Sequence, residues 1–147
     1  MGSSSSQESH RELPGKSSPP PQSSAERAAK YALVVDDDAD FCTIMRVMLK
    51  WRGFEAQIAY SAADAWNSLS EIDPDIMLID IAMPDVDGLQ LVRELRSDEK
   101  FAKTPIIMIT ARAIREMLEA SEEAGADFFL TKPVSLFELT STIDKLM

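Results

Sequence analysis

The sequence has few of the residues that form disulfide bonds, soft metal sites or membrane spans. Its 147 residues include one cysteine, Cys42, and one histidine, His10. A single cysteine excludes an internal disulfide and a cysteine-based zinc site, and it is typical of a reducing compartment. No apolar run approaches ~20 residues, and the first thirty residues are polar, so neither a membrane span nor a secretory signal is expected. These absences favour a cytoplasmic protein.

Basic residues are also scarce. The chain has 15 Lys and Arg against 25 Asp and Glu, and after residue 30 the counts are 11 and 22. A nonspecific nucleic-acid binder needs a basic face for the phosphates, and docking on anionic lipid needs one too. The composition therefore disfavours both of these functions.

The composition changes near residue 30. Residues 1–30 contain nine serines and four prolines, and their only large apolar side chains are Met1 and Leu13. Such a segment cannot bury enough apolar surface to offset its chain entropy. We therefore predict a disordered tail or linker over residues 1–30 and a folded domain over residues 31–147.

Within the folded part, short apolar runs alternate with stretches of helical spacing. The apolar runs cover residues 32–35, 56–59, 76–79, 106–109 and 128–130. Most of them are typical of strands buried on both faces. Apolar residues three and four apart indicate helices around residues 41–49, 62–69, 89–95, 114–121 and 136–146. This alternation predicts an α/β fold, with a parallel sheet and helices on both of its faces.

Polar and charged side chains follow four of the five predicted strands, at the point where each strand ends. Asp36 and Asp37 follow the first strand, Asp80 the third, Thr110 the fourth and Lys132 the fifth. Ligands of such folds bind beyond the carboxyl ends of the strands, so these groups are expected to form one small polar site.

The residue types in this site indicate its chemistry. Carboxylates as close together as Asp36, Asp37 and Asp80 repel one another unless a cation neutralises them or one takes a proton. Oxygen ligands without histidine or cysteine favour a hard ion such as Mg²⁺. With Lys132 and Thr110 added, the set is suited to phosphoryl transfer onto a carboxylate.

The motifs around these residues resemble a two-component response-regulator receiver domain, similar to the single-domain chemotaxis regulator. The matching segments are residues 33–37, 80–88, 107–111, 125–127 and 132–133. The resemblance implies a flavodoxin-like, doubly wound sheet of five parallel strands in the order 2-1-3-4-5, with five helices. It also implies a cis bond between Lys132 and Pro133, because cis peptide bonds are essentially confined to X-Pro.

The resemblance assigns roles to the acidic residues. Asp80 matches the phosphate-accepting aspartate, which is also one of the residues of the Mg²⁺ site. Asp37 matches a direct Mg²⁺ ligand, Asp36 matches an acid that acts partly through water, and the backbone carbonyl of Ala82 matches the third protein ligand. Asp38 extends the acidic pair, and we interpret it as the cap of the first helix rather than as a ligand, since Asp is favoured there.

The resemblance also assigns a switch. Lys132 matches the lysine that pairs with the phosphoryl group, Thr110 the switch hydroxyl and Phe129 the aromatic side chain whose rotamer reports activation. The surface expected to change comprises the fourth helix, the fifth strand and the fifth helix. The side chains of Ala82 and Arg112 occupy positions that tune how fast the phosphoryl group is lost.

The resemblance implies a signalling module rather than an enzyme with an external substrate. A partner histidine kinase or histidine phosphotransfer protein would supply the phosphoryl group, because no histidine lies in the folded part. The domain would catalyse only its own phosphotransfer and dephosphorylation. The downstream effector and the oligomeric state stay open, and the chain fits both a stand-alone regulator and a piece of a larger regulator or hybrid kinase.

Three other functions fit the sequence less well. An aspartate-nucleophile hydrolase of the haloacid-dehalogenase type needs a second Asp two residues after the nucleophile, where this sequence has Ala82. A flavin or dinucleotide module needs a glycine-rich phosphate loop, and Asp36 and its neighbours stand there instead. A degenerate receiver is disfavoured because every active-site position is filled.

Some residues have a simpler structural interpretation. Trp51 and Trp66 are expected in the core or at its edge, and Cys42 is expected to be a small buried side chain. Residues 85–88, Asp-Val-Asp-Gly, have good turn chemistry, and we interpret them as a turn that borders the site, with Gly88 supplying a positive φ.

Overall fold

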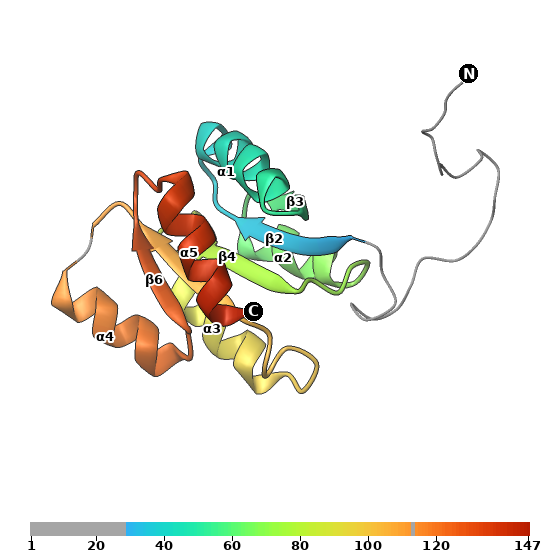
Figure 1. Cartoon of the computed structure of the whole chain (residues 1–147). Helices are drawn as coiled ribbons and strands as arrows, with labels where there is room; N and C mark the ends of the chain where they lie inside the picture. Colours follow the sequence, from blue (N-terminus) through green and yellow to red (C-terminus); the bar gives the residue numbers. More distant parts are fainter. Residues whose placement is uncertain (1–28, 113) are drawn as a thin grey trace, which may run out of the picture.

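The computed structural model describes residues 29–112 and 114–147, so almost all of the predicted tail lies outside the described residues. Strand β2 (Lys30–Val35) begins one residue before the expected start of the folded part. The elements that follow alternate strictly between helix and strand, as predicted (Figure 1). They are α1 (Ala39–Trp51), β3 (Phe54–Ala59), α2 (Ala62–Leu69), β4 (Ile76–Asp80), α3 (Gly88–Ser97), β5 (Ile106–Thr110), α4 (Arg115–Ala124), β6 (Phe128–Thr131) and α5 (Leu136–Leu146).

The five strands form one parallel sheet in the order β3-β2-β4-β5-β6. Counted along the chain, this is the order 2-1-3-4-5 that the resemblance implied, so the prediction is confirmed. The register aligns the strand ends, because Val35 pairs with Ile79, Asp80 with Ile109 and Thr110 with Thr131. Residues just after the strands are therefore brought to one edge of the sheet.

Alternate side chains of each strand enter two separate apolar clusters. Leu33 and Val35 belong to the cluster that α2, α3 and α4 cover, whereas Ala32 and Val34 face α1 and α5. Figure 1 shows the helices arranged on the two sides of the sheet. This layering confirms the prediction of helices on both faces.

Burial on both faces holds for the central strands but not for the edges. Every residue of β4 and β5 is buried, while β3 exposes Glu55 and Gln57. The expectation, which was made for most of the strands, is thus met by β4 and β5, whereas β3 lies at the edge of the sheet and is only partly buried.

The interpretation of Trp51 as a core residue is wrong, because its side chain is 79% exposed. Trp51 lies two residues after the buried Leu49, which turns it about 200° away from the inner face of α1. Trp66 is partly buried and meets the Phe101 ring edge-on at 6.1 Å, as expected for the edge of a core. Cys42 is buried, which confirms that prediction.

Side-chain caps begin several of the helices at the edge of the sheet that holds the strand ends. Asp38 accepts a hydrogen bond from the Phe41 amide, which confirms its prediction as the cap of α1. Ser61 caps α2 and Asp87 caps α3 in the same way. None of the helices in the described part combines the length and the apolar stretch that a membrane crossing needs.

Candidate functional site

Three carboxylates converge beyond the ends of β2 and β4. One oxygen each from Asp36, Asp37 and Asp80 lies within 4.8 Å of the other two. Asp36 and Asp80 are nearly buried, with exposed fractions of 1% and 6%, whereas Asp37 is exposed. The structure thus brings together the three acidic residues that the sequence indicated, because their strands are parallel neighbours in the sheet.

Lys132 is the cation of this cluster. Its Nζ lies 2.9 Å from Oδ2 of Asp36 and 3.8 Å from Oδ2 of Asp80, and it also stands 4.4 Å from the centre of the Phe41 ring. The Lys132 amide donates to the carbonyl of Thr110, which holds the segment after β6 against β5. The Lys132–Pro133 bond is cis, as the resemblance implied.

The cluster has more negative than positive charge, and the pKa values reflect this. Burial and the Asp36 carboxylate raise the pKa of Asp80 to about 6, although Lys132 and the Ala82 amide act in the opposite direction. Burial tends to lower the pKa of Lys132, but Asp36 and Asp80 outweigh it and raise that pKa above its ordinary value. The fold therefore holds Asp80 where a negative charge is unfavourable without a further cation.

The donor set fits a small divalent cation of the Mg²⁺ type. Mg²⁺ prefers carboxylate and carbonyl oxygens and keeps several waters, so a group open to solvent on one side suits it. Asp37 is exposed and supplies that open side, and Ala82, two residues after Asp80, is exposed as well. No histidine or cysteine joins the group, which agrees with a hard ion.

The loop after β4, residues 81–87, is closed at its base. The Ile81 amide donates to Ile109 O at 3.1 Å, and the Gly88 amide donates to Ile81 O at 2.7 Å. The predicted positive φ of Gly88 is wrong, since among the described glycines only Gly53 and Gly125 have one. Glycine is needed at position 88 for another reason, because a Cβ there would collide with the carbonyl oxygen of Asp80.

The turn at residues 85–88 borders the site as expected, but it also makes a contact that the sequence did not indicate. The Asp85 carboxylate accepts hydrogen bonds from the amides of Ala62 and Ala63 at 3.1 and 3.0 Å, and from its own neighbour Val86 at 2.8 Å. These backbone donors lower the pKa of Asp85. Because Ala62 and Ala63 are more than twenty residues away, no local motif could reveal the pairing.

Thr110 and Phe129 lie on the side of the sheet that α4 covers. Thr110 is buried at the end of β5, where its hydroxyl accepts from the Arg112 amide at 3.2 Å and lies 3.9 Å from the Met117 sulfur in α4. Phe129 packs on the same apolar cluster as Met117, whereas Phe128 packs on the opposite one. The two adjacent phenylalanines therefore face opposite sides of the sheet, as neighbours in a strand do.

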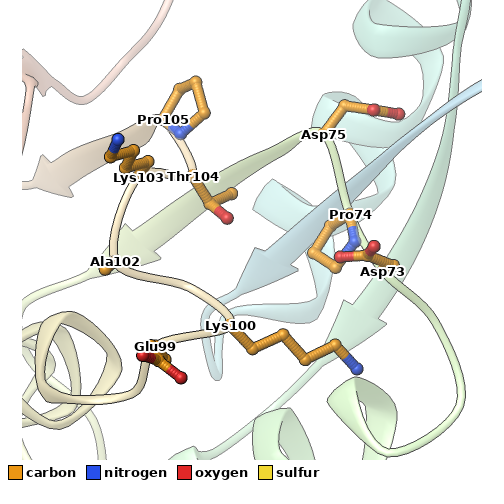
Figure 2. A pocket seen from close by; sticks show the side chains of 9 residues that line it. All are labelled: Asp73, Pro74, Asp75, Glu99, Lys100, Ala102, Lys103, Thr104 and Pro105. Carbon is orange, nitrogen blue, oxygen red and sulfur yellow. The ribbon is translucent and has the colours of Figure 1, made fainter. Parts of the chain in front are cut away.

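A cavity of about 490 Å³ lies far from these groups (Figure 2). It is lined by loop residues 73–75 and by residues between 99 and 105, which precede β4 and β5. This is the amino edge of the sheet, opposite the edge that carries Asp80. The cavity is therefore separate from the acidic site.

Comparisons with known proteins agree with this architecture. The structure is similar to the chemotaxis protein CheY4 of Vibrio cholerae, with a TM-score of 0.77 and 25% identity, covering 82% of this chain and 100% of that chain. It is also similar to a CheY-like response regulator receiver domain protein from Methanospirillum hungatei JF-1, with a TM-score of 0.74 and 30% identity over 81% of this chain and 94% of that chain.

Sequence comparison points the same way. The chain is 31% identical over 115 residues to the transcriptional regulatory protein TrcR of Mycobacterium tuberculosis (strain ATCC 25618 / H37Rv). The match covers 78% of this chain but 44% of the relative, so the chain spans less than half the length of that protein. The family model of the response regulator receiver domain matches residues 32–144. The chain belongs to the response regulator receiver domain family.

Proposed function

We propose that this receiver domain is the phosphoacceptor of a two-component phosphorelay and that Asp80 takes the phosphoryl group. The observation that carries the proposal is the position of Asp80, which lies nearly buried at the end of β4, next to Lys132 and to the carboxylates of Asp36 and Asp37. A carboxylate in such surroundings is neutralised by a cation or by a bond to an electrophile, and a phosphoryl group bound with Mg²⁺ supplies both.

The chain's own groups divide the work of the transfer. One Asp80 oxygen attacks the phosphorus of the donor, the bond between phosphorus and the donor's leaving atom breaks, and an acyl phosphate forms. Asp36, Asp37, Asp80 and the Ala82 carbonyl would hold the Mg²⁺, which would stabilise charge on the phosphoryl oxygens when bound. Lys132 already stands 3.8 Å from Asp80 and would pair with a phosphoryl oxygen.

The phosphodonor is a partner protein in this proposal. Receiver domains of response regulators work with histidine kinases, and His10, the chain's only histidine, lies outside the described residues. We therefore assign the donor as a histidine kinase or a histidine phosphotransfer protein. Because the domain acts on itself and then signals, we classify it as a signalling module and not as an enzyme with a separate substrate.

The switch follows from the contacts of Thr110. Its hydroxyl now lies 3.9 Å from the Met117 sulfur, a weak contact that a phosphoryl oxygen would outcompete. Turning toward Asp80 would free space beside β5, into which the Phe129 ring would move. The surface of α4, β6 and α5 would change as the population shifts between two states that differ in phosphate contacts.

Labelling of the full chain tests the proposal. Incubation with acetyl phosphate or phosphoramidate and Mg²⁺ should add one phosphoryl group, seen by intact mass spectrometry. Asp80→Asn should abolish the label. Asp38→Asn is the matched control, since Asp38 caps α1 and stands outside the carboxylate group, and it should label normally. Unchanged labelling of Asp80→Asn would refute the assignment.

A further inference from the structure

The loop between β4 and α3 is anchored by hydrogen bonds at two places. Its base is fixed by the Ile81 amide on Ile109 O and by the Gly88 amide on Ile81 O. Its far side is fixed by Asp85, whose carboxylate accepts hydrogen bonds from the first two amides of α2. Helix α2 itself lies against β2 and β3. Three residues, 82–84, connect the two anchors.

The Asp85 carboxylate is the acceptor for amides of α2 that have no acceptor within the helix. The first turn of a helix leaves its amide groups without intrahelical acceptors. At the start of α2, the Ser61 hydroxyl accepts a hydrogen bond from the Asp64 amide, and the Asp85 carboxylate accepts hydrogen bonds from the amides of Ala62 and Ala63. The positive end of the helix dipole also favours a carboxylate at this place. The loop is thus joined to α2 by two hydrogen bonds from one side chain.

We propose that Asp85 is a positioning residue that holds the Ala82 carbonyl in place for Mg²⁺. The inference rests on the proposed function. Asp85 is outside the group formed by Asp36, Asp37 and Asp80, so it acts through the backbone and not as a ligand. Ala82 lies between Ile81, which the sheet holds, and Pro84, whose ring fixes φ, so the direction of its carbonyl depends on where Asp85 pins the loop.

Loss of this anchor should weaken Mg²⁺ binding without touching a ligand. Removing a hydrogen bond that orients a metal ligand typically lowers metal affinity about tenfold or more. Asp85→Ala removes both bonds to α2, so its dissociation constant for Mg²⁺ should rise about tenfold. Asp85→Asn keeps one acceptor oxygen, so its dissociation constant for Mg²⁺ should lie between those of the wild type and the alanine variant.

Asp64→Ala is the matched control, because it removes the same charge from the same end of α2. Asp64 is exposed and accepts one long hydrogen bond, from Tyr60 at 3.4 Å, without any tie to the loop. Mg²⁺ affinity of the full chain would be measured by calorimetry for the wild type and the three variants. A dissociation constant that rises equally in Asp85→Ala and Asp64→Ala would overturn the proposal, because loss of charge would then explain both.

Two further readouts separate positioning from general stability. In metal-free protein, the amides of Ala82 and Met83 should exchange with solvent at least about threefold faster in Asp85→Ala than in Asp64→Ala, because the loop opens locally. The phosphorylation rate from acetyl phosphate should recover to near the wild-type value at saturating Mg²⁺. A rate that stays low at saturation, or unchanged exchange, would contradict the inference. A wild type that binds no Mg²⁺ would instead refute the proposed function.

Discussion

At the amino edge of the sheet, charged side chains are matched with partners, whereas at the carboxyl edge three carboxylates face one lysine. Arg96 of α3 donates to the carbonyls of Gly125, Phe101, Ala102 and Thr104, at 2.7 to 3.2 Å, and pairs with Asp127. Asp127 also accepts from the Ile106 amide at the start of β5. Asp36, Asp37 and Asp80 have no such balance.

The difference shows how the same fold separates stability from chemistry. At the amino edge, the side chains of Arg96 and Asp127 bond to nearby backbone and to each other, so they join α3 to the segments that precede β5 and β6. At the carboxyl edge, burial and the Asp36 carboxylate raise the pKa of Asp80, so the ionised carboxylate destabilises the resting protein. That imbalance is what a cation or a phosphoryl group can relieve, so the two edges should respond differently to mutation.

The largest expected effect is at the amino edge. Arg96→Ala should lower the free energy of unfolding by about 3 kcal/mol, because several carbonyls and Asp127 lose their donor together. Urea denaturation would measure this. Arg93→Ala, in the same helix but exposed with one side-chain partner, should change stability by about 0.5 kcal/mol or less. Equal losses of stability in the two variants would show that the hydrogen bonds of Arg96 do not stabilise the fold.

At the carboxyl edge, removal of the Asp80 charge should raise the free energy of unfolding instead of lowering it. Because the folded pKa of Asp80 is about 6 and its ordinary value is 3.8, protonation stabilises the folded state. This contribution is complete below about pH 4 and is lost as pH rises through about 6. Metal-free Asp80→Asn should therefore be more stable than the wild type by about 1 to 2 kcal/mol at pH 7.5, and the difference should shrink at pH 4.5.

Thermal or urea denaturation at the two pH values, without Mg²⁺, would measure the difference between wild type and Asp80→Asn. A variant less stable than the wild type at pH 7.5 would mean that the Asp80 charge is already neutralised in the resting protein. The contrast between the two edges would then be lost.

Addition of Mg²⁺ should stabilise the wild type by about as much as Asp80→Asn stabilises the metal-free protein. At ten times its dissociation constant, an ion that binds only the folded state adds about 1.4 kcal/mol. Asp37→Ala should abolish this gain. Asp38→Ala should lose about 1 kcal/mol of basal stability with its helix cap, yet keep most of the Mg²⁺ gain. Equal loss of the gain in both variants would mean that Asp37 is not the principal ligand.

Much of the fold was predictable because its signals are local. Apolar runs such as 76–79 and 106–109 are central strands with every residue buried, and their periodicity carries that information. The convergence of Asp36, Asp37 and Asp80 was predictable as well, because a parallel sheet brings strand ends together without further detail. The strand order came from the resemblance, since spacing alone does not fix it.

The parts that could not be predicted depend on contacts between distant segments. Asp85 and Arg96 look like ordinary surface charges in sequence, and their partners lie 22 to 31 residues away for Ala62, Ala63, Gly125 and Asp127. Trp51 was misplaced because large apolar side chains usually enter the core, while the direction of the last turn of α1 sends this one to solvent. In each case tertiary geometry, not residue type, decides the role.

The smallest expected effect concerns how long a phosphoryl group would stay on Asp80. Its loss requires a water in line with the Asp80–phosphorus bond, and polar side chains nearby can orient that water. Ala82 and Arg112 are both exposed, and each lies two residues past the end of its strand, at the edge of the sheet that carries Asp80. Ala82 has no group to bind water.

Arg112 is long and cationic, so it can lie over the phosphoryl oxygens and hinder the approach of water. The double variant Ala82→Asn with Arg112→Glu would offer water-orienting groups at both positions and should speed the decay about threefold, equivalent to about 0.7 kcal/mol in the barrier. Decay of purified phosphoprotein in Mg²⁺ would be followed by mass spectrometry, with each single variant as control and Arg112→Glu expected to have the larger effect. An unchanged or slower decay in the double variant would show that other residues control the attacking water.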